Sequence, residues 1–325
     1  MAGTKFWKKF VLVQIGDTEI NGDQLEVQFK IKSAPEKPDE LELVIYNLSD
    51  GSVDPKKDTK AKLIPDVLIK LTAGYADYYG VVHIGKLWQW NDEYDGADVK
   101  TTITSLSVLT GLDRKCINLN YVKGTRKIDA AKDMLKAAVL TFSEIDDDCD
   151  ITYTSPKVFT NTKSLKQNLT EIATEIGYIL LERKGALVFI RKNSGTTTGF
   201  ELNVDSGLIS VRKVVIKKEI PEPVKVEEPG FFDKVMSYLP SMGGRSTATP
   251  TDTESSAERD FEVTCLFNHE LSIGAIIDLK SNISKGIKRC RIEEMDMSSS
   301  GSEHVCNLQL KIIAAQKNVV PITPA

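Results

Sequence analysis

The feature that most constrains the fold is a strict alternation of apolar and polar residues in short segments. Residues 25–32 read LEVQFKIK, with apolar side chains at the odd positions and Glu, Gln or Lys at the even ones. A period of two residues is typical of a β-strand that buries one face. The segment 41–46, LELVIY, repeats the pattern, and we count roughly six such strands in residues 1–107. This density of short strands predicts a closed or sandwich-like β domain.

Residues 108–200 have a different periodicity and predict a small α+β module. Ile128, Ala131 and Leu135 recur at helical spacing, and we expect Thr125 to cap the N-terminus of that helix. A second helix is expected over 164–176, where Ser164 and Gln167 fit a capping box. Residues 178–192, YILLERKGALVFIRK, predict a hairpin because two apolar runs flank a Lys-Gly turn.

Strand-like segments return in residues 201–325, which predict a second β domain interrupted by an insertion at 217–258. The insertion is rich in Pro, Ser, Thr and Glu, a composition that predicts a flexible segment. Within it, GFFDKVMSYL predicts a short amphipathic helix. That helix could dock on its own domain, bind a partner groove or touch a membrane. The candidate partner-binding residues are Phe231, Phe232, Met236 and Leu239.

Composition and charge exclude several classes of protein. Charged residues make up 27% of the 325 residues and the formal net charge is −4, so there is no basic excess to grip nucleic acid or an anionic membrane. No stretch approaches the roughly 20 apolar residues that span a bilayer. The five cysteines are scattered without a CxxC pair, which predicts free thiols in a reducing compartment. Cys290 and Cys306 both lie in strand-like segments and could face each other.

No sequence motif predicts catalysis, a cofactor or a metal. The three histidines, His83, His269 and His304, stand in no HExxH or His-Cys arrangement, and the chain contains no GxSxG, GxGxxG or P-loop. We expect a strand histidine to be structural. Asp146, Asp148 and Asp150 have the alternate spacing of calcium ligands, but the glycine and the final glutamate of an EF-hand loop are missing. We therefore expect a solvated acidic loop there.

Trp88 and Trp90 alternate along one predicted strand, with Tyr94 close by. Such a row of aromatic side chains could stack on a sugar. We expect part of a barrel wall or a contact between subunits instead, because aromatic residues are enriched at protein interfaces.

The order of several segments resembles the baseplate hub, or tail hub, proteins of long-tailed bacteriophages and contractile injection particles. These segments are LELVIYNLS, the helix SLKQNLTEIATEIG with the hairpin segment KGALVFI, VTCLFNHELSIGAIIDLKS, and IKRCRIEEMDMSSSGSEHVCNLQL. The resemblance covers nearly the whole chain except 217–258. Residues 207–211 read GLISV where the family typically has GLIGSP, which is a local departure from the family pattern.

The resemblance implies an α+β, mainly β fold in which two tail-tube-like β-barrel domains, 1–107 and 201–325, flank the α+β module of 108–200. It also implies a non-enzymatic structural protein of the virion tail baseplate, present in the host cytoplasm during assembly. A homotrimer would adapt the sixfold tail tube above to the threefold central spike below, with DNA only in transit through a channel. Other expected partners are the tape-measure protein and other baseplate subunits, with no membrane. The alternative is a tail-associated cell-wall hydrolase or carbohydrate-binding component.

Overall fold

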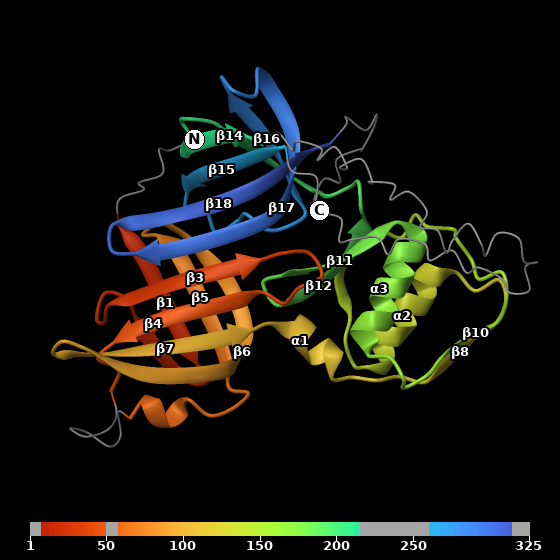
Figure 1. The fold of residues 1–325 in the computed structure, drawn as a ribbon, viewed down its shortest axis with the longest axis horizontal. Coiled ribbons are helices and arrows are strands. Elements are labelled where there is room, and N and C mark those ends of the chain that lie inside the picture. The colour runs from red at the N-terminus through yellow and green to blue at the C-terminus, as the bar shows by residue number, and fades with distance from the viewer. Residues whose placement is uncertain (1–7, 50–57, 215–259, 314–325) are drawn as a thin grey trace, which may run out of the picture.

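The computed structural model describes residues 8–49, 58–214 and 260–313 (Figure 1). Strands dominate the described chain, three α-helices lie in its middle, and a short 3-10 helix, Lys60–Lys62, precedes β5. The first β half contains β1 (Lys9–Ile15), β2 (Thr18–Asn21), β3 (Val27–Ser33), β4 (Glu40–Tyr46), β5 (Leu68–Tyr75), β6 (Tyr78–Asp95) and β7 (Asp98–Leu106). The middle contains α1 (Val108–Asp113), β8 (Leu119–Tyr121), α2 (Lys127–Ala137), β9 (Phe142–Ile145), β10 (Lys157–Phe159), α3 (Leu165–Ile176), β11 (Tyr178–Arg183) and β12 (Ala186–Arg191). The second β half contains β13 (Thr196–Leu202), β14 (Leu208–Lys213), β15 (Phe261–Leu266), β16 (Ala275–Ser281), β17 (Gly286–Ser300) and β18 (Glu303–Ile312).

The first β half has the strand order β2-β1-β5-β6-β7-β4-β3, with every neighbouring pair antiparallel. Its first three strands, β1, β2 and β3, all lie before residue 34. Gly16 adopts a left-handed conformation, with φ of 56°, and turns the chain back so that Val13 pairs with Ile20. The glycine that ends the first apolar run therefore makes a hairpin.

The second β half has the order β14-β15-β18-β17-β16, again antiparallel throughout, and β13 joins β16 in parallel. The two halves are not separate sheets. Strand β17 also pairs with β3 of the first half, and this ladder unites all thirteen strands in one sheet. Figure 1 shows β17 and β3 side by side where the two β halves meet.

The larger hydrophobic core draws on both β halves. Buried side chains from β1, β3–β7 and β15–β18 form one cluster, which also includes one face of the β11–β12 hairpin. Aromatic rings meet at the boundary between the halves. Phe267 stacks on His304 with ring centroids 4.0 Å apart and meets Phe29 edge-on at 5.8 Å. Both phenylalanines are buried, so the two halves share apolar contacts and cannot be separated without exposing them.

The middle module has a core of its own, in which α2 and α3 pack on the sheet β11-β12-β9 (Figure 1). The predicted capping box is confirmed: the Ser164 hydroxyl accepts from the Gln167 amide, and the Gln167 side chain accepts from the Ser164 amide. The prediction of Thr125 as the other cap was wrong. Arg126 occupies the N-cap position, because a backbone bridge between Arg126 and Thr152 holds that residue extended.

The predicted fold class, α+β and mainly β with a small helical module between two strand-rich ends, is confirmed. The division at residues 107/108 and 200/201 stays a prediction. The insertion at 217–258 lies outside the described residues, and so do the candidate partner-binding residues Phe231, Phe232, Met236 and Leu239.

Candidate assembly edges

The two β halves repeat one arrangement of strands. The five-strand orders β3-β4-β7-β6-β5 and β14-β15-β18-β17-β16 follow the same sequence order, and all their neighbouring pairs are antiparallel. Strand β3 therefore corresponds to β14, and β6 to β17. The flanking strands differ, because β1 joins β5 antiparallel whereas β13 joins β16 parallel.

The long central hairpins of the two halves match residue by residue. The ladder β6–β7 has a register shift between Leu87 and Gln89, and the ladder β17–β18 has one between Ile292 and Glu294. From each shift the strand runs seven residues, 89–95 and 294–300, to a two-residue turn. A β-bulge changes the local twist and direction of a strand. Its identical placement makes the two hairpins equivalent in shape.

Strand β17 forks. Its first part, up to Arg291, pairs with β16. Beyond the bulge the same edge pairs with β3, from Met295 opposite Ser33 to Ser299 opposite Phe29. The pairing is antiparallel, and Lys30 lies 3.9 Å from Asp296 across it. The edge of β17 thus serves two strands in turn.

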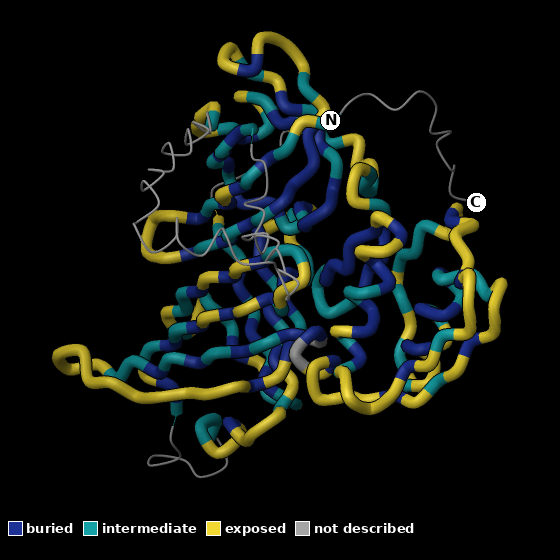
Figure 2. Tube along the Cα trace, turned by 45° about the vertical axis from the view of Figure 1, so that its right-hand side comes forward, coloured by how far each residue is buried: buried dark blue, intermediate teal, exposed yellow. Residues whose placement is uncertain are grey.

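Strand β6 begins in the same way but has no second strand partner among the described residues. It pairs with β5 from Tyr78 to Lys86 and then continues to Asp95 beside β7 alone. In the described ranges, no strand occupies its outer edge beyond Lys86. The Val67 carbonyl accepts from the Leu87 amide at 2.9 Å, and Lys60 lies 2.8 Å from Asp92. Figure 2 shows the far end of this hairpin as an exposed arm that projects from the sheet.

Strand β14 presents the complementary open edge. It pairs with β15, and no other described strand lies beside it. Its counterpart β3, in contrast, lies between β4 and β17. Ile209 on β14 is 56% exposed, and Arg212 and Lys213 carry positive charge at its end. Unpaired strand edges attract other strands, so natural proteins cover or pair them.

The tip of the β17–β18 hairpin forms hydrogen bonds to residues of the first half. The Lys9 ammonium donates to the carbonyls of Gly301 and Glu303 at 2.6 and 2.8 Å. Burial lowers the pKa of Lys9, and the nearby Glu303 carboxylate opposes that shift. Ser300 contacts the Gln28 side chain at 3.1 Å. The corresponding tip of β6–β7 is contacted within its own half, where the Asn47 side chain donates to the Asp98 carboxylate at 2.8 Å and accepts from the Val99 amide at 3.0 Å.

The row of aromatic residues on β6 is divided by the bulge. Trp88 occupies the bulge and lies beneath the Arg114 guanidinium, 5.5 Å from it, beside a hollow of about 440 Å³ next to α1. Trp90 instead donates its indole N–H to the Leu63 carbonyl at 3.1 Å. Tyr94 is 85% exposed near the hairpin tip. The three rings therefore do not form one continuous stacking face. The exposed Tyr94 lies on the part of β6 beyond Lys86, which pairs with β7 alone among the described strands.

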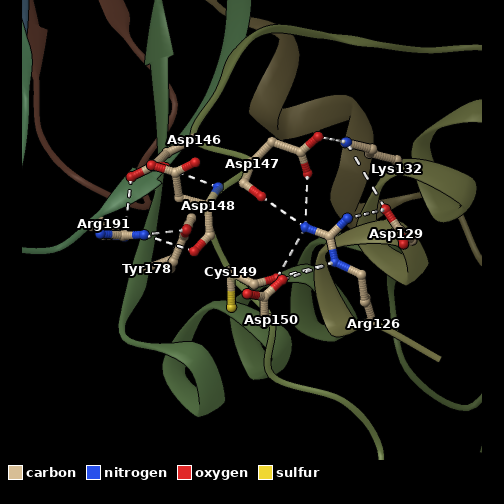
Figure 3. Close-up of polar contacts among 10 residues, drawn as sticks. All are labelled: Arg126, Asp129, Lys132, Asp146, Asp147, Asp148, Cys149, Asp150, Tyr178 and Arg191. Carbon is tan, nitrogen blue, oxygen red and sulfur yellow. Dashed lines mark hydrogen bonds and ion pairs between the residues drawn. The ribbon is translucent and has the colours of Figure 1, made fainter. Parts of the chain in front are cut away.

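The acidic loop at residues 146–150 is balanced by basic side chains rather than arranged around a cation site. Figure 3 shows Arg126 and Lys132 turned toward Asp147, with Arg191 on the other side. Lys132 lies 2.8 Å from Asp147 and lowers the pKa of that carboxyl, and Arg191 lies 3.2 Å from Asp146. In the part of the chain that the structure describes, no group of three or more His, Cys, Asp or Glu side chains could hold a metal ion.

The two histidines that lie in strands, His83 and His304, have structural roles. His83 and His304 are buried, and burial lowers the pKa of each to about 4. His83 Nε2 contacts the Ser105 hydroxyl at 3.0 Å, and His304 Nε2 contacts the Gly74 carbonyl at 3.1 Å. Both side chains therefore serve packing and hydrogen bonding at neutral pH.

All five cysteines are free thiols, as the sequence predicted. The pairing considered for Cys290 and Cys306 is not formed. Cys306 lies opposite Cys265 on β15, whereas Cys290 lies opposite Ile277 and Ile312. Among the described helices, none combines the length and apolarity needed to cross a bilayer.

The sequence did not point to the two open edges. Alternation identified β6 and the segment of β14 as strands, but it carries no information about which edge of a strand is covered. One signal was present: the hairpin segments 89–98 and 294–303 place a glycine at the same distance from the bulge. That repeat is visible only once both bulges are known.

Comparisons with solved structures place this fold among tail proteins. A 43 kDa tail protein of prophage MuSo2 from Shewanella oneidensis is 13% identical, with 94% of this chain and 98% of that chain covered at a TM-score of 0.60. A tail protein from Neisseria meningitidis MC58 is 12% identical, with 94% and 96% covered and a TM-score of 0.60. An E. coli component of the type VI secretion system, described as structurally similar to the T4 tail proteins gp27 and gp5, is 9% identical, with 95% and 79% covered, also at 0.60.

No protein-family model and no curated protein matches the sequence. The structural likeness extends over nearly the whole of this chain and of the two prophage and bacterial tail proteins. The resemblance to hub-like tail and baseplate proteins, expected from the order of the sequence segments, is confirmed at the level of the fold.

Proposed function

We propose that this chain is a structural hub of a phage tail or a related particle, built as a homotrimer that joins the tail tube to the central spike. The observation that carries this proposal is the repeat of the five-strand unit, with matched bulges and turns, inside one chain. The shared fold of solved tail proteins supports the same role.

A chain with two like units suits an adaptor between two symmetries. Three copies carry six units around an axis, which matches a sixfold tube, while the copies themselves match a threefold spike. Closed rings of identical subunits also pair strand edges that an isolated subunit leaves open. In this arrangement the tail tube lies on one face, the spike on the other, and DNA passes through the central channel without being bound.

We place the protein in the virion tail baseplate, after assembly in the host cytoplasm, in contact with the tape-measure protein and other baseplate subunits. Its role is structural, with no enzymatic activity, cofactor or membrane contact. The insertion 217–258 would contact another baseplate or tail protein through Phe231, Phe232, Met236 and Leu239. Deleting 221–257 should impair baseplate assembly and infectivity, and an unaffected particle would remove that part of the proposal.

Native mass spectrometry tests the stoichiometry of the hub. The full-length chain is co-expressed with the spike and tube proteins encoded beside it, and the purified complex is weighed. Three copies of this chain per complex are expected. A complex with one, two or six copies, or a chain that binds neither neighbour, would contradict the proposal. A peptidoglycan zymogram on the same preparation should show no clearing, whereas a clear band would favour a cell-wall hydrolase.

A further inference from the structure

We propose that the hollow between β6 and α1 is a docking site for a short segment of another protein, in which a large apolar side chain lies next to carboxylates. The hollow measures about 440 Å³, which is within the roughly 300–1,000 Å³ of typical ligand pockets. Its walls come from the first β half, from α1 and from Leu140 after α2. The site belongs to one copy of the chain, so the inference goes beyond the proposed ring and does not depend on it.

A glycine on α1 keeps the hollow open. Gly111 lines it, and a Cβ added at that position would meet no atom within 4 Å beyond its neighbours and the α1 backbone. A larger side chain there would therefore enter the hollow. Glycine destabilises a helix relative to alanine, so the open space is kept at a cost to α1. An open position of this kind leaves room for a side chain from a partner.

The apolar wall of the hollow is exposed. Leu68 at the start of β5 and Trp88 at the bulge of β6 both line it, and each is 53% exposed. Leu140 adds a third apolar side chain, from the middle module. Ligand pockets are lined mostly by apolar and aromatic side chains, and tryptophan is among the residues that contribute most to binding at protein interfaces. This wall therefore favours a large apolar side chain.

The rim of the hollow is basic. Its charged residues are three cations, Lys86, Arg114 and Lys115, and one carboxylate, Asp66. Lys86 lies 3.9 Å from Asp66, and both side chains are well exposed, so this ion pair is weak. Arg114 lies over the Trp88 ring, and Lys115 donates to a backbone carbonyl at 2.9 Å. Within the described ranges neither has a carboxylate partner, so a negatively charged ligand would meet two uncompensated cations.

The two features together favour an acidic segment with an apolar anchor. Asp113, which precedes the basic pair in the chain, is paired instead with Lys166 on α3 at 3.3 Å. Carboxylates that flank an apolar side chain can reach the basic rim while that side chain fills the hollow. Complementary charge guides such a partner to the site, and burial of the anchor supplies most of the affinity. A nucleic acid could meet the cations but would leave Leu68 and Leu140 without apolar contact.

Binding of a short fluorescent peptide to the full-length chain, read by fluorescence anisotropy, tests the site. The probe has two phenylalanines flanked by glutamates. One control peptide carries glutamines in place of the glutamates, and the other carries serines in place of the phenylalanines. The probe should bind saturably, and each control should bind at least about tenfold more weakly. A probe that does not bind, or that binds no better than the controls, would overturn the proposal.

Two substitutions at one position separate a filled hollow from a misfolded chain. Gly111→Phe places a ring in the hollow and should weaken probe binding at least about tenfold. Gly111→Ala, the matched control, adds only a methyl group and should bind like the wild type. In a charge swap, Arg114→Glu should lose the glutamate probe and gain a peptide with lysines in its place, which a folding defect would not produce. Equal binding by the Gly111→Phe and Gly111→Ala variants would refute the site.

Two further outcomes identify the occupant and separate this site from the ring. Deleting 221–257 should leave the affinity for the probe unchanged, whereas tighter binding would assign the hollow to the insertion of this chain and overturn the assignment to a partner. Peptide binding and copy number are read independently. A chain that binds the probe but forms no trimer contradicts only the proposed ring, and a trimer that does not bind the probe contradicts only this site.

Discussion

Truncating Phe267 should destabilise both β halves together. The side chain is fully buried, stacks on His304 at 4.0 Å and meets Phe29 of the first half at 5.8 Å. Replacing a buried phenylalanine by alanine costs about 3–5 kcal/mol, because apolar contacts are lost and a cavity remains. With a urea m-value of up to about 3 kcal/mol/M, Phe267→Ala should lower the unfolding midpoint by about 1 M or more.

The assay reads the first half while the mutation lies in the second. Trp88 and Trp90 both lie on β6, so their fluorescence in a Trp7→Phe background reports unfolding of the first half. Phe267 follows β15 in the second half. If the halves form one cooperative unit, the tryptophan transition should move by the full amount.

The matched control is Phe189→Ala, which removes an equally buried phenylalanine from the separate core of the middle module. It should shift the helical circular dichroism transition more than the tryptophan transition. A tryptophan transition that stays unmoved in Phe267→Ala would refute the shared core, because it would mean that the first half unfolds without the second.

Three further outcomes are expected. Burial holds the pKa of His83 and His304 at about 4, below the ordinary value, so only the unfolded state gains protons between about pH 6.5 and 4. Stability should therefore fall as pH falls through that window, and thermal unfolding measures this loss. Burial and the Glu182 carboxylate raise the pKa of Asp39 to about 8, so its carboxyl in the folded protein keeps a proton that the unfolded chain loses. Stability should therefore fall as pH rises towards 8. The variant Asp39→Asn should flatten that dependence, and an unchanged pH profile would contradict the assignment. Ser164→Ala should cost about 1 kcal/mol by removing the capping box of α3, measured by urea unfolding, whereas no loss would mean that the cap is dispensable.

Local features of this fold could be predicted from the sequence because they depend on neighbouring residues. Alternation over 25–32 identified β3, and the Ser164–Gln167 spacing identified the start of α3. Each of these elements carries its own signal in periodicity or in a cap. The prediction failed at Thr125, where a bridge to Thr152 from a distant segment moved the cap to Arg126.

The candidate site depends on pairings that no local pattern encodes. Ser33 pairs with Met295, far along the chain, and nothing in either segment specifies the other. The bulge at Trp88 separates the two tryptophans, because Trp88 lies against Arg114 whereas Trp90 donates to the Leu63 carbonyl, and the alternation of the two residues in the sequence does not reveal this. Cys306 faces Cys265 rather than Cys290 because the register of the strands, not their alternation, decides which residues meet.

A cryo-electron microscopy reconstruction of the assembled hub, computed without imposed symmetry, tests the central claim most directly. Our account predicts three copies whose six five-strand units superpose around one axis. A reconstruction in which the first and second halves occupy unrelated positions, or in which a single copy encloses no ring, would contradict it.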